Sequence, residues 1–263
     1  MLRCVVHGPA VIALLLAGCG RIGFDTTDAG VDSTAPIGHD EDGDGIANVD
    51  DLCPHLPGPH DDGDGDRVGD DCDPEPTNPR QTLTLFTFMP GDQPMTLGGP
   101  GTWTQGADSI HYDGIGTGSG FVTGQVSDIR IALGIDILAK LGGSVQHQLA
   151  LGVNDSSSTT GYFVELNEIG GVSRASAGSF DGTSYRSLDS TPLPNGVHLG
   201  AVFLQDTMVG PPTPSVTMDG GWPGEMYTES GSAPAYSGGE DFSFATNNLE
   251  IEVRYLVLVV SAS

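Results

Sequence analysis

Hydrophobic and polar residues alternate with a period of two through much of the chain after residue 80. The clearest run places apolar residues at the odd positions from Ile129 to Ile137, with polar or small residues between them. This alternation is typical of strands that bury one face. The same pattern, or a short apolar run, predicts further strands at 83–88, 109–112, 120–123, 145–153, 162–166, 197–204, 216–218 and 249–260.

Glycine and proline clusters separate these runs at short intervals, and no stretch of the sequence offers a helix of three turns. The chain of 263 residues contains 40 glycines and 18 prolines, and both residue types oppose helix interiors. Residues 81–263 are therefore predicted to form a mainly β domain, a two-sheet antiparallel sandwich.

The first 18 residues combine a short basic start with the apolar run 11–17. This run is too short to cross a bilayer as a helix, which requires about 20 apolar residues, so it favours a signal peptide. The sequence Leu16-Ala17-Gly18-Cys19 resembles the lipobox of bacterial lipoproteins. The resemblance implies cleavage before Cys19 and attachment of a diacylglyceryl group to its thiol. The alternative is an ordinary secretory signal followed by a chance cysteine.

A lipidated Cys19 predicts a protein of the bacterial cell envelope, with the membrane as a partner. Gly20, a residue other than aspartate after the cysteine, is compatible with an outer-membrane lipoprotein exposed at the cell surface. Residues 19–38 have no apolar period and are predicted to form a disordered tether.

Charge excludes one class of partner. The chain has 35 acidic and 9 basic residues, a formal charge of −26, so its field would repel a nucleic acid. Many of the acidic residues fall within residues 39–80, called the acidic segment below.

The acidic segment repeats one pattern of aspartates twice. In residues 40–51 and again in residues 62–73, aspartate occupies the first, third, fifth and twelfth positions. In a tight loop, side chains spaced by two converge on one point and supply the hard oxygen ligands that calcium prefers. Magnesium demands a tighter octahedron and is the lesser candidate. A disordered acidic linker is the alternative interpretation.

An EF-hand is excluded because helices cannot flank the first block, where Pro54, Pro57 and Pro59 follow at once. Each block instead carries a cysteine near its end, at Cys53 and Cys72. These two remain after Cys4 leaves with the signal peptide and Cys19 takes the lipid, and an even remainder in an exported protein favours one disulfide. A pair of zinc ligands is the weaker alternative.

Two tandem Asp-rich blocks with a cysteine each resemble the thrombospondin type 3 repeat. The resemblance implies a stalk without a hydrophobic core that wraps around calcium ions, with Cys53 joined to Cys72. It also implies two ligand sets: Asp40, Asp42, Asp44 and Asp51 with the Ile46 carbonyl, and Asp62, Asp64, Asp66 and Asp73 with the Val68 carbonyl. Arg67 departs from the first block, which has Gly45 there, and costs strain if its φ is positive. We expect the sandwich to melt almost independently of this stalk.

The order of features in residues 81–263 resembles the concanavalin A-like lectin/glucanase jelly roll, in its laminin G-like branch. The resemblance is carried by Thr102-Trp103-Thr104, Ile110-His111-Tyr112-Asp113, the strand pair at 128–153, Val216-Thr217-Met218-Asp219-Gly220 and the final strand at 249–260. This fold serves lectins, enzymes and structural modules alike. It implies an adhesion module or a recognition module for a glycan or an extracellular protein.

Catalysis has little support in the sequence. Glucanases of this fold use two glutamates on one strand face, and Glu250-Ile251-Glu252-Val253-Arg254 has arginine where the acid/base glutamate belongs. No catalytic residue is assigned, and a polysaccharide hydrolase or lyase remains the alternative.

The glycine-rich stretch between Asp219 and Asp241 is predicted to be a long loop. It carries Trp222, Tyr227 and Tyr236, whose rings either stack on a sugar or fold back onto the core. The core interpretation is favoured.

Overall fold

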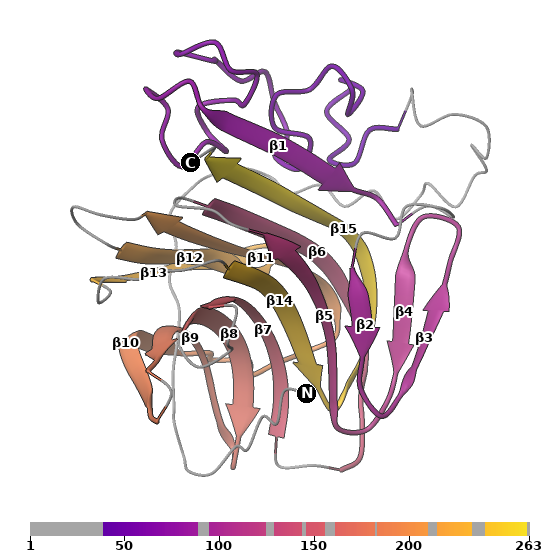
Figure 1. Cartoon of the computed structure of the whole chain (residues 1–263). Coiled ribbons are helices and arrows are strands. Elements are labelled where there is room, and N and C mark those ends of the chain that lie inside the picture. Colours follow the sequence, from indigo (N-terminus) through magenta and orange to yellow (C-terminus); the bar gives the residue numbers. More distant parts are fainter. Residues whose placement is uncertain are drawn as a thin grey trace.

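The computed structural model describes residues 39–88, 95–124, 129–143, 146–155, 161–181, 183–209, 215–232 and 240–261. In these residues the backbone forms fifteen strands and no helix. The strands make two antiparallel sheets packed face to face (Figure 1). Within the same ranges no helix is long and apolar enough to cross a membrane.

The eight-stranded sheet, sheet A, has the order β13-β12-β11-β6-β15-β4-β3, and β1 also pairs with β15. Its strands are β1 Gln81–Phe86, β3 Thr102–Gln105, β4 Ile110–Asp113, β6 Ile129–Lys140, β11 Gly200–Val209, β12 Ser215–Trp222, β13 Glu225–Ser232 and β15 Leu249–Ser261.

The seven-stranded sheet, sheet B, has the order β10-β9-β8-β7-β14-β5-β2. Its strands are β2 Thr96–Gly98, β5 Thr117–Gly124, β7 Gln146–Asp155, β8 Gly161–Ile169, β9 Val172–Phe180, β10 Tyr185–Pro192 and β14 Glu240–Asn247. Strands β7 to β10 are neighbours in sequence order, whereas the pairs β7–β14, β14–β5 and β5–β2 join non-consecutive strands, as in a jelly roll. The predicted antiparallel sandwich is confirmed.

The main core lies between the sheets and follows the predicted alternation. Ile131, Leu133 and Ile135 on β6 are at most 1 % exposed and face Leu149 and Val164 from sheet B. Burying one face of each strand in this way supplies most of the driving force for folding.

Strand β15 buries both of its faces near its end. Leu249, Ile251 and Val253 point into the core, but the register shifts between Val253 and Tyr255. After this bulge the even residues Leu256 and Leu258 face the core, while Tyr255, Val257 and Val259 point outward. These outward residues are at most 2 % exposed, so something must cover the outer face of sheet A.

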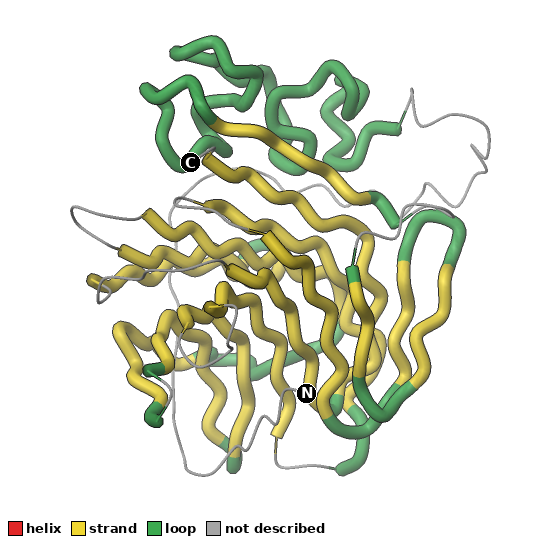
Figure 2. Tube along the Cα trace, viewed as in Figure 1, coloured by secondary structure: helices red, strands yellow, loops and turns green. Residues whose placement is uncertain are grey.

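The acidic segment is that cover. Cys53, Val68 and Cys72 form one buried apolar cluster with five outward residues of sheet A: Ala132, Phe203, Tyr255, Val257 and Val259. Figure 2 shows the segment as an irregular coil lying against the end of the molecule that carries β1 and β15. The expected coreless stalk therefore needs correction, because the segment has no core of its own but shares one with the sandwich.

The sequence missed several strands for a common reason. Strands β9, β10 and β13 are rich in serine, glycine, threonine and alanine, so they lack the apolar alternation that marks the others. The predicted loop at 219–241 is mostly wrong, because β12 and β13 form a hairpin through most of it.

Candidate metal centre

Two loops of the acidic segment, residues 40–51 (the first loop) and 62–73 (the second loop), fold through the same hydrogen bonds. The first-position aspartate accepts two backbone amides in each loop. Asp40 accepts from Gly43 at 2.9 Å and Gly45 at 2.8 Å, and Asp62 accepts from Gly65 at 2.7 Å and Arg67 at 3.0 Å. The two blocks that repeat in sequence therefore also share the same loop conformation around their first aspartate.

The ninth position also repeats, and the sequence analysis missed it. The side chain of Asn48 accepts the Glu41 amide at 2.9 Å, and Asp70 accepts the Gly63 amide at 2.8 Å. The available signal was an Asn or Asp at the same place in both blocks. These bonds close each loop on itself and hold its carboxylates in place.

The fifth-position aspartates tie each loop to the chain that follows it. Asp44 accepts the amides of Ile46 at 2.7 Å and Gly58 at 2.8 Å. Asp66 accepts the amide of Val68 at 2.9 Å and also that of Gln81, the first residue of β1, at 2.8 Å. The second loop is therefore joined directly to sheet A.

The third- and twelfth-position aspartates each leave one oxygen unused. In Asp42, Asp51, Asp64 and Asp73, Oδ1 accepts a backbone amide two residues later. Their Oδ2 atoms are buried and have no hydrogen-bond partner within the described ranges. Burying an unpaired carboxylate oxygen is costly, so unpartnered oxygens at the same two positions of both loops fit a bound cation.

The electrostatics of the loops agree with this fit. Burial raises the pKa of Asp42 to about 7, and the nearby charges of Asp44, Asp51 and Asp40 add to the effect. Burial likewise raises the pKa of Asp73 to about 6, with Asp66 and Asp64 adding to it, and raises that of Asp51. Such crowding is unfavourable for bare carboxylates, and a divalent cation would relieve it.

The ligand atoms also lie close enough to share an ion. One carboxylate oxygen from each of Asp40, Asp42 and Asp44 lies within 4.8 Å of the others, and the same holds for Asp62, Asp64 and Asp66. Oxygen-only donors in a flexible loop are the ligands of calcium rather than of zinc. The structure thus brings together the first three aspartates predicted for each loop.

The sixth residue of each loop has a positive φ, although it is glycine in the first loop and arginine in the second. Gly45 has φ 92° and Arg67 has φ 76°, so an arginine occupies the left-handed conformation that glycine occupies in the first loop. The seventh-position residues also differ in surroundings, since the Val68 side chain is buried against sheet A and Ile46 is only partly buried.

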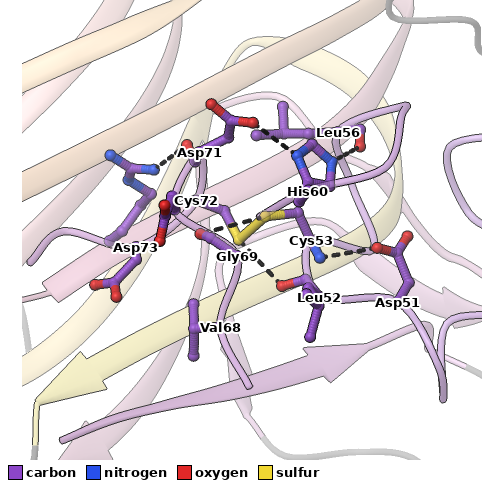
Figure 3. Close-up of a disulfide and its surroundings, with 12 residues drawn as sticks. Asp51, Leu52, Cys53, Leu56, His60, Val68, Gly69, Asp71, Cys72 and Asp73 are labelled. Atoms are coloured by element: carbon purple, nitrogen blue, oxygen red, sulfur yellow. Dashed lines mark hydrogen bonds and ion pairs between the residues drawn. A yellow bond between two sulfur atoms is a disulfide. The ribbon is translucent and has the colours of Figure 1, made fainter. Parts of the chain in front are cut away.

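The disulfide between Cys53 and Cys72 is confirmed, with Cα atoms 5.8 Å apart. Figure 3 shows it at the centre of the segment, beneath His60 and beside Gly69. A side chain at Gly69 would lie 2.7 Å from Cys53 Sγ and 2.8 Å from His60 Cβ, so glycine is required there. The bond joins the ends of the two loops.

Polar and aromatic contacts fix the segment to sheet A. The Arg130 guanidinium donates from Nη1 to the Asp71 carbonyl at 2.6 Å and from Nε to Thr207 at 3.0 Å. The fully buried His55 ring stacks on Phe203, with centroids 6.2 Å apart. Burial, with the nearby Arg130 charge, lowers the pKa of His55 to about 3, so the ring is neutral at pH 7. None of these anchors was predicted.

The aromatic residues predicted for a ligand loop belong instead to the hairpin or lie outside the described residues. Trp222 is 3 % exposed, donates from Nε1 to the His198 carbonyl at 3.1 Å and stacks on that histidine. Tyr227 is 9 % exposed and packs in the main core. Tyr236 lies outside the described residues, as does Cys19. The core interpretation of the first two rings is correct.

The carboxylates considered for catalysis are engaged on the outer face of sheet A. His111 pairs with Glu250 at 3.1 Å, Ser109 donates to Glu252 at 2.7 Å, and Arg254 donates to Asp136.

Comparison with known proteins identifies a fold and no family. No family model matches the chain, and no curated protein matches it. Among solved structures, the CBM2 module of the evolved Dit of Lactobacillus casei phage J-1 is similar with a TM-score of 0.54 and 9 % identity, covering 70 % of this chain and 98 % of that one. Lectin II from Ulex europaeus has a TM-score of 0.51, 10 % identity and coverage of 69 % and 99 %.

Peanut lectin, solved with a nine-residue peptide, is similar with a TM-score of 0.50 and 10 % identity, and covers 69 % of this chain and 97 % of its own. At these identities the similarity shows the fold alone. The chain therefore has the jelly-roll sandwich fold that these lectins and this module share.

Proposed function

We propose that the protein is a calcium-binding, lipid-anchored protein of the bacterial outer membrane whose sandwich recognises a carbohydrate. The observation that carries the calcium proposal is the repeated pair of buried, unpartnered carboxylate oxygens in the two loops. The observation that supports carbohydrate recognition is the fold shared with a carbohydrate-binding module and two lectins.

Calcium would complete each loop through residues already in place. Asp40, Asp42, Asp44 and Asp51 would hold one ion, and Asp62, Asp64, Asp66 and Asp73 the other, with the Ile46 and Val68 carbonyls as further ligands. The ion supplies positive charge to crowded carboxylates. Because the loops lie on sheet A through Val68 and the disulfide, their order would keep that face covered.

The membrane anchor of this proposal is Cys19. A diacylglyceryl group on its thiol would tether the protein to the bilayer, and residues 20–38 would connect it to the acidic segment. Mass spectrometry of the membrane fraction should find Cys19 at the new N-terminus and acylated, and Cys19→Ser should release the protein. Soluble protein with an unmodified Cys19 would contradict the anchor.

A glycan array tests the recognition function. The soluble chain lacking residues 1–19 should bind a defined set of glycans in millimolar calcium and return them unchanged. A protein that shortens the bound polysaccharide would belong to the rival class of hydrolases or lyases. Absence of binding to any glycan on the array would contradict recognition.

A further inference from the structure

The outer face of sheet B carries transverse rows of side chains on β7, β8, β9 and β10. Inward residues of these strands, such as Leu149, Leu166 and Ala175, lie in the core, so the alternate residues point away from it. The pairing places the rows in this order along the strands: Gln148–Asn167–Arg174, then Ala150–Glu165–Ser176–Ser190, then Gly152–Phe163–Gly178–Ser187, then Phe180–Tyr185.

Glu165 organises the polar part of this face. It is 5 % exposed although it points away from the core, and its carboxylate accepts three side-chain hydrogen bonds. Gln148 donates to one oxygen, while Asn167 donates to the other at 2.8 Å and Ser176 at 3.2 Å. Because the Asn167 NH₂ group is directed to Glu165, the orientation of the Asn167 amide is fixed. An ordinary outward glutamate extends into water and makes no such network.

An aromatic cluster adjoins the polar rows. Tyr185 packs on Phe180 at a centroid distance of 4.7 Å and edge-on against Phe163 at 5.6 Å. The Phe163 ring lies over Gly178, where a side chain would approach its Cζ to 2.4 Å. Tyr185 is nevertheless 50 % exposed. Three rings on an outward sheet face, one of them open to solvent, suit a partner with an apolar surface of its own.

Charge narrows the class of partner. Arg174, in the row of Gln148 and Asn167, donates from Nη1 to Ser190 at 3.1 Å, but its buried Nε has no hydrogen-bond partner in the described part of the chain. The Arg174 side chain as a whole is partly exposed, and a guanidinium donates to hydroxyl or carbonyl oxygens. The formal charge of −26 opposes a polyanion, so a neutral ligand fits better.

The geometry points to the outer face of sheet B as the ligand surface, and to a neutral oligosaccharide chain as its ligand. This inference rests on the proposed carbohydrate recognition. A sugar ring has an apolar C–H face, which Tyr185 would receive, and a rim of hydroxyl groups, which the partly exposed side chains of Gln148 and Arg174 would bind. Asn167 is 1 % exposed, so it supports the network around Glu165 without meeting the ligand. Phe163 and Asn167 are four residues apart on one strand, a span of about 13 Å, which suits a chain better than a single sugar. Sheet A has its outer face covered by the acidic segment, whereas the acidic segment lies far from β7–β10 (Figure 1).

Two variants and a matched control test this surface in the presence of calcium. The probes are neutral hexasaccharides of glucose, mannose and xylose, with a hexagalacturonate as the anionic comparison, titrated calorimetrically against the soluble chain. Tyr185→Ala should weaken binding of the best neutral probe about tenfold, while Tyr185→Phe should keep most of it. Glu165→Gln should also weaken binding, because one of the two acceptor oxygens becomes an NH₂ donor and opposes a side chain that donates to it in the wild type. The control is Leu199→Ala, a residue 54 % exposed outside this face.

The outcomes separate this surface from the proposed function. Loss of affinity in both variants, with unchanged melting temperatures and an unaffected control, supports the surface. If the wild type binds and either variant binds equally well, the surface is wrong although carbohydrate recognition stands. Stronger binding of the galacturonate overturns the neutral class. If the wild type binds no probe here and no glycan on the array, the proposed function fails and this inference with it.

Discussion

At the scale of single residues, the positions of the aspartates in the two loops were predictable from the sequence. The hydrogen bonds that each carboxylate oxygen makes were not. The spacing of Asp40, Asp42 and Asp44 is enough to predict converging carboxylates. Which oxygen accepts a backbone amide and which stays unpartnered depends on how the loop folds, so it appears only in three dimensions. Arg130 and His55 are a similar case, because the residues they contact are distant in sequence.

Arg67 provides a test of backbone strain within a loop. A non-glycine residue at φ 76° costs about 1 kcal/mol or more, so Arg67→Gly should strengthen calcium binding at the second loop several-fold. Arg67→Gln removes the charge and keeps the strained backbone, and the gain of glycine over glutamine isolates the strain. Calorimetric titration of the three proteins measures it. Equal affinities for the glycine and glutamine variants would show that strain is unimportant.

Asp206 provides a test of a buried carboxyl in the main core. It lies on β11 between the core residues Leu204 and Met208, is 1 % exposed, and has no hydrogen-bond partner for either oxygen among the residues described. Burial raises its pKa from 3.8 to about 8. Below pH 3.8 the Asp206 carboxyl is protonated in both the folded and the unfolded chain. Between pH 3.8 and about 8 it loses its proton in the unfolded chain but keeps it in the folded one. Stability should therefore fall as pH rises, by up to about 1.4 kcal/mol per pH unit.

Asp206→Asn keeps the shape and removes this titration. The variant should match the wild type at about pH 4 and be more stable by several kcal/mol at about pH 8. Urea unfolding across this range in saturating calcium measures the difference. A constant difference between the two proteins at all pH values would contradict a raised pKa at Asp206.

At the scale of elements, strands that alternate were predictable and strands built from small residues were not. β6, β7 and β8 follow the period of two closely. β9 was missed because its inward residues are Ala175 and Ala177, which carry little hydrophobic signal. The end of β15 has a sequence feature that indicates burial on both faces. Residues 255–260 are all apolar, which is typical of a strand buried on both faces and predicts a second cover.

If the two loops bind calcium, their packing on sheet A predicts that calcium stabilises the sandwich, contrary to the expectation of an independent stalk. A chelator should let the aspartates repel and the segment loosen, which uncovers Phe203, Tyr255 and Val257. The melting temperature should fall by about 2–4 °C for each kcal/mol lost, and binding of a dye specific for apolar surfaces should rise. The Asp42→Asn, Asp64→Asn double variant should behave in calcium as the wild type does in chelator. An unchanged melting temperature and dye signal would restore the independent stalk.

At the scale of the whole molecule, the two outer faces of the sandwich differ in what packs against them. The acidic segment packs on the outer face of sheet A and carries the crowded carboxylates, and it lies far from strands β7–β10 of sheet B (Figure 1). Cys19, the proposed site of lipidation, precedes the acidic segment in sequence. Under the proposed function, the two loops would lie in sequence between the lipidated Cys19 and the sandwich.

The central claim is that the two loops bind calcium, and direct titration tests it best. Calorimetry on the soluble chain should detect about two ions with dissociation constants of about 10⁻⁴ to 10⁻³ M, as in extracellular modules. Asp42→Asn should remove one ion and Asp64→Asn the other, because each places an amide at a buried, unpartnered oxygen. Asp50→Asn changes the charge equally at an exposed position and should retain both. No heat at several millimolar calcium, or equal loss in the Asp50 control, would contradict the account.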